Sequence, residues 1–549
     1  MAASDLRSIA YPKLTEEQSE ELARRADASL RSYEDGQALF ECGDSETCFY
    51  VVRSGSVEIT DNSGDEPKTI AVHQPGEFTG DVALLTGARA IVSGIARGTT
   101  AVYEIPVDRL RQALNEWPAL GDMVLQAFIA RRQLLKESPD YTGLRLIGSR
   151  YDPETFRIRD FLARNCVLFT WLDVETDPEM DRLLGRLGVT MDEMPVLACG
   201  HKLLLRNPSN EELASRLGIR HTPGRTVYDL VVVGAGPAGL AAAVYGASEG
   251  LHTVVLERTA PGGQAGSSMR IENYLGFPTG LTGRDLADRA AIQAAKFGAE
   301  MSVPARVARM EFDNQYPVLC LDGGDTVITK CLLIATGADY RKLGVGGCEE
   351  FEGRGVYYAA TPNEAQVCRG SQVVVVGGGN SAGQAAVFLA EHARKVLILV
   401  RSDDLNKSMS AYLVQRIERT PNIEVLYDTE VCRICGSGHL SSVEAVNNQT
   451  GEKRCIEASA VFSFIGAAPR TDWLPPEIEK DRKGFVCTGP TLEHSGSWSA
   501  RRQPFLLESS RPGVFAAGDV RSGSVKRVAS AVGEGAMAVQ FVHQYLAER

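Results

Sequence analysis

The stretch YDLVVVGAGPAGLAAAVYGASEGLHTVVLE, residues 228–257, decides the fold of the larger part of this chain. The β-branched run Leu230–Val233 predicts a strand buried on both faces, and an Ala-rich helix and a second apolar run follow it. The G-x-G-x-x-G turn between strand and helix permits a tight turn, close approach to a pyrophosphate and close helix packing. The helix N-terminus offers unpaired N–H groups to phosphate oxygens, and Glu257 stands where an acid accepts ribose hydroxyls. The stretch therefore predicts a site for an adenine dinucleotide.

Length and composition set the class of protein. At 549 residues the chain is too long for one core, and the length predicts roughly three to four domains. A hydrophobic content of 44% and a charged content of 23% are ordinary for a soluble globular protein. The net charge of -12 argues against nucleic acid as the main partner. No apolar run reaches the length of a membrane span, and residues 1–18 lack the apolar core of a signal peptide. We expect a cytoplasmic protein with no membrane association, in which the twelve cysteines are reduced.

Residues 38–105 contain short β-rich runs that alternate with Gly- and Asp-rich turns, which predicts a small β-barrel or jelly roll. The segment PGEFTGDVALLTGARAIVSG, residues 75–94, lies before the last of these runs. It contains a short apolar helix over 80–85, with Asp81 at its start and Arg89 after it. Helix N–H groups and a guanidinium can hold one phosphate, while Asp81 can accept a ribose hydroxyl. The segment therefore predicts a small anion site.

This segment resembles the phosphate-binding cassette of cyclic nucleotide-binding domains, and the resemblance covers about residues 30–140. It implies that Arg89 binds the cyclic phosphate and that 107–135 is the C-terminal helix that moves on ligand binding. Ala90 stands where a threonine favours cGMP, so cAMP is favoured over cGMP. The family usually has Glu where Asp81 stands, and the alternative is a domain of this fold that binds no nucleotide. The ligand-binding residues that the resemblance implies are Gly80, Asp81, Val82, Arg89 and Ala90.

Residues 143–222 follow a β-α-β-α-β-β-α pattern. Met194-Pro195 before the third strand predicts a cis-proline turn, and Ser209 with Glu212 predicts a capping box. The pattern is similar to a thioredoxin/glutaredoxin-like domain, whose redox members carry C-x-x-C at the position of residues 149–154 here. This stretch has no cysteine, so we expect an adaptor or docking surface in place of a redox centre. The predicted helices are Glu154–Arg164, Pro178–Leu187 and a last one after Ser209.

Four blocks beyond Glu257 resemble the FAD domain of low-molecular-weight thioredoxin reductases: APGGQAGSS (260–268), IENYLGFP (271–278), CLLIATGADY (331–340) and GVFAAGDVRSGSVKRVASAVGEGAMA (513–538). The resemblance implies that Gln264 and Asn273 lie by the flavin and that Asp519 accepts from the ribityl hydroxyls. The helix that begins near Val528 would then stabilise the reduced flavin through its dipole. The FAD-binding residues predicted in this way are Gly234, Gly236, Pro237, Ala238, Gly239, Glu257, Gly263, Gln264, Asn273, Thr336, Gly337, Gly518, Asp519, Arg527, Val528 and Ala529.

A second dinucleotide unit lies between the two halves of this domain. VVVVGGGNSAGQAAVFLA, residues 373–390, again predicts strand, glycine turn and helix. The next apolar run leads to Arg401, whose guanidinium can pair with a 2′-phosphate, and this favours NADPH over NADH. The family usually has a further basic residue here, for which Lys407 is a candidate; a surface charge on an NADH domain stays an alternative. The predicted NADPH-binding residues are Gly377, Gly379, Asn380, Ser381, Ala382 and Arg401.

The redox centre of thioredoxin reductases is missing from the inserted domain. The family carries two thiols and an acid in the pattern YCATCD, where this chain reads YAATPN. Ala359, Pro362 and Asn363 occupy the positions of the lost dithiol and acid, so we expect no catalytic side chain beside the flavin itself. Cys432 and Cys435 lie on a predicted strand, where a separation of three sends side chains to opposite faces and disfavours a disulfide.

These observations predict a multi-domain oxidoreductase. Residues 1–142 form the β-barrel or jelly-roll domain, 143–222 the thioredoxin-like α/β domain, and two Rossmann-like three-layer α/β domains comprise 223–345 with 467–549 (FAD) and 346–466 (NADPH). Hydride would pass from NADPH to FAD and then directly to an unidentified acceptor, a small molecule or a protein, as in diaphorase-like and ferredoxin-reductase-type relatives. Two alternatives stay open: a signalling protein that senses redox state and nucleotides through partner binding, and a thioredoxin-disulfide reductase with displaced cysteines. The resemblance implies a homodimer, and we expect no metal site.

Overall fold

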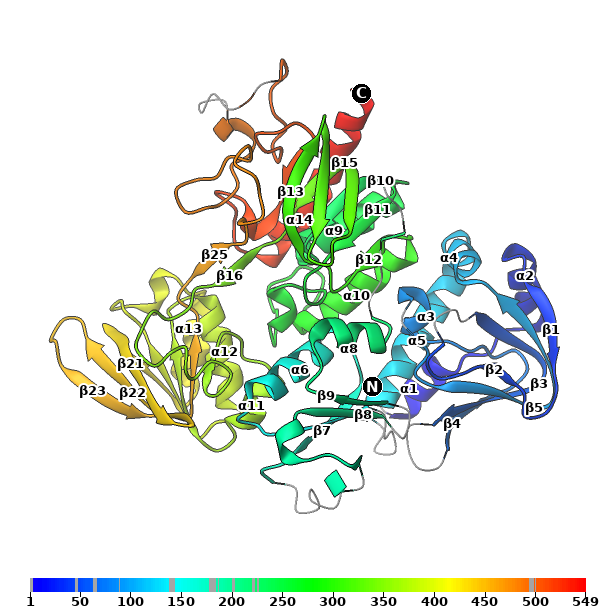
Figure 1. Ribbon diagram of the computed structural model, residues 1–549, viewed down its shortest axis with the longest axis horizontal. Coiled ribbons are helices and arrows are strands. Elements are labelled where there is room, and N and C mark those ends of the chain that lie inside the picture. Colours follow the sequence, from blue (N-terminus) through cyan, green and yellow to red (C-terminus); the bar gives the residue numbers. More distant parts are fainter. Residues whose placement is uncertain are drawn as a thin grey trace.

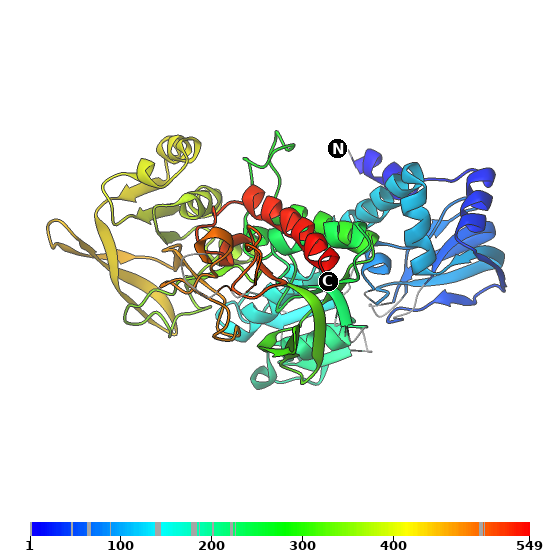
Figure 2. The same ribbon diagram turned by 90° about the horizontal axis from the view of Figure 1, so that it is seen from above.

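The computed structural model describes residues 3–44, 48–62, 67–87, 89–137, 144–176, 184–185, 187–199, 203–219, 223–224, 227–492, 498 and 500–549. Figures 1 and 2 show an N-terminal unit (3–137) at one end, an inserted unit (346–463) at the other and a central unit between them. A linking unit (144–219) lies below the central unit in Figure 1. No helix among the described residues is both long enough and apolar enough to cross a bilayer.

The N-terminal unit is built on a five-stranded antiparallel sheet of order β1-β5-β3-β4, with β2 paired to β5. One helix was expected over 107–135, but two are present, because Pro118 begins a new helix and cannot continue the preceding one. Two of the expected short runs join into the long strand β3. The elements are α1 Ala3–Ala10, α2 Glu16–Arg25, β1 Ser29–Tyr33, β2 Ala38–Phe40, β3 Phe49–Asp61, β4 Lys68–His73, α3 Val82–Thr86, β5 Ser93–Ile105, α4 Val107–Glu116 and α5 Pro118–Glu137.

The linking unit has a four-stranded mixed sheet of order β7-β6-β8-β9. Strands β6 and β7 are parallel, and β8 and β9 continue the sheet antiparallel. The Met194–Pro195 peptide bond is cis, as predicted, and Ser209 caps α8 by accepting from the Glu212 N–H at 3.2 Å. The predicted helix over 178–187 lies mainly outside the described residues. The elements are β6 Leu144–Gly148, α6 Pro153–Arg164, β7 Phe169–Asp173, β8 Val196–Cys199, β9 Leu203–Arg206 and α8 Asn210–Arg216.

The central unit has three layers around a seven-stranded sheet. Strands β12, β11, β10, β15 and β26 are parallel, with β14 and β13 added antiparallel. Helices α9, α10 and α14 pack on one face, while apolar side chains of the segment around Ile478 pack together with those of β13 and β14 in the core on the other face. The elements are β10 Val227–Val233, α9 Pro237–Ser248, β11 Thr253–Leu256, α10 Gly283–Lys296, β12 Glu300–Ser302, β13 Val307–Asp313, β14 Tyr316–Leu321, β15 Thr326–Ile334, β26 Val514–Ala516 and α14 Val528–Ala547.

The inserted unit repeats this plan with a parallel sheet of order β17-β24-β18-β19-β20. Helices α12 and α13 pack on one face, and the three-stranded sheet β21-β22-β23 packs on the other. Two short antiparallel strands, β16 and β25, join it to the central unit. The elements are β16 Ala338–Tyr340, β17 Val356–Tyr357, α11 Pro362–Val367, β18 Gln372–Val376, α12 Asn380–Ala390, β19 Lys395–Leu399, α13 Ala411–Arg419, β20 Ile423–Leu426, β21 Thr429–Ser437, β22 His439–Asn447, β23 Lys453–Glu457, β24 Ala460–Ser463 and β25 Ala467–Pro469.

Candidate functional site

The three glycines of the G-x-G-x-x-G turn after β10 (the first fingerprint) are Gly234, Gly236 and Gly239, and they lie in different surroundings. Gly234 has φ +106°, and a Cβ there would lie 2.4 Å from the Ala335 carbonyl oxygen. A Cβ on Gly239 would lie 1.8 Å from the carbonyl oxygen of Gly234, so α9 packs directly on the turn. Gly236, the N-cap of α9, has only the Gly263 Cα within 4 Å of a Cβ, at 3.9 Å. The first and third glycines are therefore required by the chain itself, while the second borders open space suited to a pyrophosphate.

Glu257 is held beside this turn. Its carboxylate is buried and accepts from the backbone N–H of Ala235 at 2.8 Å and of Thr259 at 2.9 Å. Each carboxylate oxygen has more than one lone pair, so both can also accept from a ribose hydroxyl. The predicted acid thus lies directly after β11 beside the glycine turn, and its contact with a ribose stays a prediction.

Segments far apart in sequence complete the first site. Gly518 lies against α9, because its Cβ would be 3.1 Å from that of Ala238. The next residue, Asp519, is half-buried, and burial raises the pKa of its carboxyl. Gln264 donates to the carbonyl of Ala338, in the segment that follows Thr336 and Gly337. Arg527 is exposed at the N-cap of α14, and Val528 and Ala529 form the first turn of that helix. Pro237 begins α9. Asn273 is exposed in the 271–280 loop.

The glycine turn after β18, residues 377–382 (the second fingerprint), is built in the same way. Gly377 has φ +135°, and a Cβ there would lie 2.5 Å from the Phe464 carbonyl oxygen. A Cβ on Gly379, the N-cap of α12, would have no atom within 4 Å. Asn380 accepts from the Ser410 N–H at 2.7 Å, and Ala382 is fully buried in the third position. The start of α12 therefore also borders open space.

The basic residues after β19 lie at the surface. Arg401 is exposed two residues beyond the end of the buried strand β19. Lys407, the candidate for a second phosphate contact, forms an ion pair with Asp403. The role of Arg401 as a partner for a 2′-phosphate stays a prediction.

Tyr340 contacts the second fingerprint, and sequence analysis did not select it. Its hydroxyl donates to Ser381 Oγ, on the first turn of α12, at 3.1 Å. Burial raises the pKa of Tyr340, and the carboxylate of Asp519 raises it further. The ring packs edge-on against Phe464, with ring centroids 5.3 Å apart. One side chain of β16, in the segment that follows Thr336 and Gly337, therefore contacts the start of α12.

The segment of the lost dithiol forms the start of α11. Ala359 precedes the helix, Thr361 caps it by accepting from the Asn363 N–H at 3.3 Å, and Pro362 is its first residue. Glu364 is completely buried, and burial raises its pKa to about 7. The side chain of Asn363 accepts from Arg159 of the linking unit at 3.4 Å. This end of α11 supplies neither a thiol nor an acid at the expected positions.

Cys432 and Cys435 lie on β21, in the sheet that covers the face opposite α12. A β-bulge at Cys432 interrupts the simple alternation of side chains that the sequence predicted. The Cys432 thiol donates to the Glu444 carbonyl at 3.2 Å, and the Cys435 thiol lies 4.0 Å from the carboxylate of that residue. All twelve cysteines belong to the described part of the chain, and none is in a disulfide there. The two thiols are thus separated from the start of α12 by the parallel sheet.

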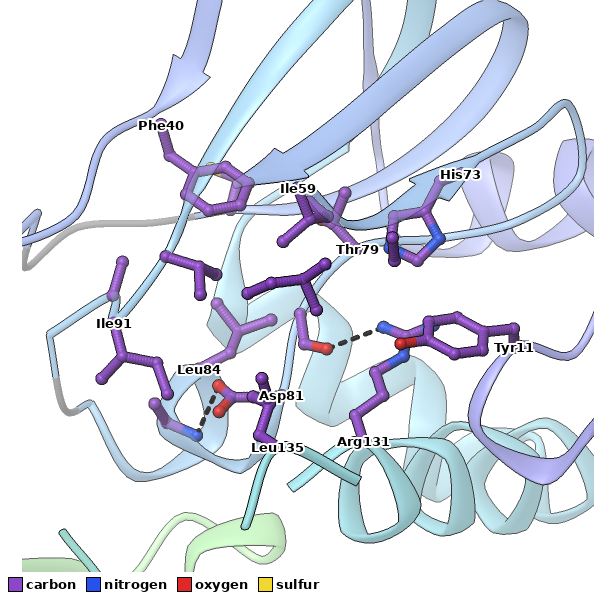
Figure 3. Close-up of a pocket in the computed structure, with 17 residues that line it drawn as sticks. Tyr11, Phe40, Ile59, His73, Thr79, Asp81, Leu84, Ile91, Arg131 and Leu135 are labelled. Carbon is purple, nitrogen blue, oxygen red and sulfur yellow. Dashed lines mark hydrogen bonds between the residues drawn. The ribbon is translucent and has the colours of Figure 1, made fainter. Parts of the chain in front are cut away.

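A pocket in the N-terminal unit encloses about 730 Å³, including the space at its open mouth (Figure 3). Its apolar wall comes from side chains that include Phe40, Ile59, Leu84, Ile91 and Leu135. The buried Arg131 of α5 points into it and donates to the carbonyls of Ala10, Phe78 and Gly80 at 2.7–2.9 Å. Burial lowers the pKa of Arg131 to about 10, so the guanidinium is charged at neutral pH. Sequence analysis missed this cation because α5 is distant from the cassette in sequence.

The cassette residues divide between the pocket and the outer surface. Asp81 caps α3 by accepting from the Ala83 N–H at 2.9 Å, and its other oxygen is buried with no hydrogen-bond partner among the described residues. Gly80 and Ala90 line the pocket, and Val82 is buried beside them. Arg89 is exposed, donates to the Gly43 carbonyl at 3.1 Å and lies against Gly218 of the linking unit, where a Cβ would be 2.1 Å from its Cγ. Its role as a phosphate ligand stays a prediction.

Two known protein families match separate parts of this chain. The family model for pyridine nucleotide-disulphide oxidoreductases matches residues 228–535, and that for the cyclic nucleotide-binding domain matches residues 30–116. The thioredoxin reductase of Treponema pallidum is 35% identical over 321 residues, which is 58% of this chain and 98% of that protein. The thioredoxin reductases of Lactococcus lactis (FR conformation) and T. acidophilum are each 31% identical with TM-scores of 0.53. These matches cover 59% and 58% of this chain and 100% and 99% of those structures.

Proposed function

Because the chain belongs to the pyridine nucleotide-disulphide oxidoreductase family and carries a cyclic nucleotide-binding domain, we propose that it is a cyclic-nucleotide-regulated oxidoreductase without a thiol relay. The enzyme is an NAD(P)H-dependent flavin oxidoreductase of thioredoxin reductase-like fold, with FAD and NADPH as cofactors. The observation that carries the proposal is the start of α11, where Ala359, Pro362 and Asn363 replace two thiols and an acid. Electrons therefore leave from the cofactor site itself, without an intervening protein disulfide.

The residues around the two fingerprints support direct transfer. FAD held at the first glycine turn would supply the redox chemistry, with hydride from NADPH and an acceptor of small-molecule or protein class. The open space at Gly236 and at Gly379 accommodates the two pyrophosphates, and Tyr340, in the segment that follows Thr336 and Gly337, contacts the start of α12. The chain thus brings the two cofactors together by proximity and orientation.

Anaerobic rapid mixing of the holoenzyme with NADPH, followed by an acceptor screen, tests this function. We expect full bleaching of the flavin absorbance, then fast reoxidation by a quinone, ferricyanide, a ferredoxin or oxygen, and none by thioredoxin disulfide. Turnover well above background would also count against a purely signalling protein. Efficient reduction of a protein disulfide would contradict the proposal.

Replacement of Cys432 and Cys435 together by Ser tests whether displaced thiols act in the reaction. We expect unchanged NADPH oxidation and unchanged acceptor turnover, because the thiols lie on the sheet face away from α12. The exposed Cys455 on β23, replaced by Ser, is the matched control. Loss of activity in the double variant, but not in the control, would establish a thiol relay.

The position of Arg89 supports regulation by the nucleotide. A phosphate that draws this guanidinium toward Asp81 would remove its contact with Gly218 and so alter the linking unit. For Arg89→Ala we expect cAMP to bind about ten- to a hundredfold more weakly, since a charged hydrogen bond contributes roughly 1.5–3 kcal/mol. Calorimetry gives the affinity, and the rate of flavin reduction with and without cAMP gives the regulation.

Arg109, exposed on α4 and outside the pocket lining, provides the matched control as Arg109→Ala. It should bind cAMP as the unaltered protein does. Equal cAMP affinity in Arg89→Ala and in the unaltered protein would show that Arg89 is not the phosphate ligand. A rate of flavin reduction that cAMP leaves unchanged, despite measured binding, would refute regulation.

A further inference from the structure

The inserted unit is joined to the central unit by a narrow connection. Among the described residues the chain passes between them at β16 and β25, which pair antiparallel over three residues each. A connection of two short strands can absorb a change in backbone dihedrals, as hinges do. Contacts elsewhere also hold the two units together: Arg416 of α13 donates to both carboxylate oxygens of Glu272 in the central unit, at 2.9 and 3.1 Å, and the linking unit bridges them through α6.

One end of α6 is attached to the central unit. The Asn165 side chain at the C-cap donates to the Thr259 carbonyl at 2.9 Å. Arg284 of α10 donates to the Arg164 carbonyl and, at 2.9 Å, to the Cys166 sulfur. The Cys166 thiol donates to Asp288, on the same face of α10, at 3.0 Å. The C-terminal end of α6 and the residues just after it are thus attached to α10 through Arg284 and Asp288, and to the segment after β11 through Asn165.

The other end of α6 is attached to the inserted unit. The Phe156 ring packs on Tyr357 of β17, with centroids 5.5 Å apart. Just before the helix, Tyr151 stacks on His439 at the start of β22, with centroids 5.1 Å apart. Arg159 donates to Gln366 at 3.1 Å and to Asn363 at 3.4 Å, both on α11. These contacts reach three elements of the inserted unit.

Arg159 has the properties of a residue that sets geometry. Its side chain is 2% exposed, and its guanidinium lies 3.5 Å from the centroid of the Trp171 ring. A buried guanidinium is costly unless its donors are satisfied, and its donors project in a fixed fork. Its Nη2 donates to both acceptors on α11, while its Nε has no hydrogen-bond partner among the described residues. The shared Nη2 donor therefore restricts the distance between α6 and α11.

We propose that α6 is a strut that holds the inserted unit against the central unit in one orientation, with Arg159 as its positioning residue. The helix has twelve residues, roughly 18 Å, and in Figure 1 it runs from α11 toward α10. The inference rests on the proposed function, because an enzyme without a dithiol needs only the orientation in which NADPH meets the flavin. Arg132 of the N-terminal unit donates to the Cys166 carbonyl, so the nucleotide-binding unit contacts the same strut.

The strut is tested in the holoenzyme with Asn363→Ala combined with Gln366→Ala, which leaves the linking unit intact. We expect flavin reduction at saturating NADPH to slow about tenfold, with the dissociation constant for NADPH unchanged. Arg159→Met should behave in the same way, and Arg159→Lys should recover part of the rate. Arg369→Ala, exposed beyond the end of α11, is the control and should react like the unaltered enzyme.

Hydrogen–deuterium exchange of β16 and β25 provides the readout that a folding defect would not give. We expect these two strands to exchange faster in the double variant, while β6 to β9 stay as protected as before. Unchanged hinge exchange together with an unchanged reduction rate would overturn the strut. If NADPH fails to reduce the flavin of the unaltered enzyme, the proposed function fails, and hinge exchange still decides the strut.

Discussion

Replacing Gly236 by Ala is expected to give a folded protein that has lost most of its FAD. The new methyl group meets no protein atom nearer than the Gly263 Cα at 3.9 Å, so the chain itself accommodates it. The methyl group fills the space next to the backbone that the pyrophosphate of FAD needs. Overpacking of this kind costs about 1–3 kcal/mol, which is roughly a ten- to hundredfold loss in FAD affinity. The flavin absorbance per chain of purified protein, with circular dichroism for the fold, measures the effect.

Two other glycines serve as controls for this result. Gly239→Ala places a methyl group 1.8 Å from the Gly234 carbonyl oxygen, so it should damage the fold as well as FAD binding. Gly379→Ala meets nothing within 4 Å and should keep FAD while weakening NADPH binding. Full FAD occupancy in Gly236→Ala would show that the pyrophosphate does not lie at the start of α9.

Arg401→Ala is expected to raise the KM for NADPH about ten- to a hundredfold and to leave that for NADH nearly unchanged. The guanidinium lies at the surface beyond β19, where the 2′-phosphate of the adenosine is expected. A hydrogen bond between charged groups contributes roughly 1.5–3 kcal/mol, and NADH lacks the phosphate that would accept it. Steady-state rates with both nucleotides and a fixed acceptor measure the change.

Lys407→Ala is the matched comparison for Arg401. Because Lys407 is paired with Asp403, its loss should alter the KM for NADPH less than about threefold, as expected for an exposed ion pair. An equal rise in KM for NADH and NADPH in Arg401→Ala would show that this residue does not read the 2′-phosphate. A large effect of Lys407→Ala would assign the phosphate contact to that residue.

The parts of the fold that the sequence predicted are those set by neighbouring residues. The β-α-β order around Gly234 and Gly377 follows from apolar runs and glycine turns, and both units have the expected three layers. The cap at Ser209 and the cis bond before Pro195 were predicted from a few adjacent residues. The single helix over 107–135 that the family resemblance implied was wrong, since Pro118 begins a second helix there.

The sequence by itself determined which chemistry is present. It has two glycine turns, each followed by a helix and a strand that lead to Glu257 in one case and Arg401 in the other, and it has no thiols at Ala359 and Pro362. These features depend on residue type at short spacing, which sequence records directly. The tertiary structure alone decided that Tyr340 contacts the start of α12, that Arg131 lines the pocket of the N-terminal unit and that Arg159 donates to α11. Such contacts join separate elements; Arg159 and its acceptor Gln366 are about two hundred positions apart in the sequence. They therefore depend on how whole units pack to bury apolar surface and satisfy buried polar groups. No local pattern contains that information.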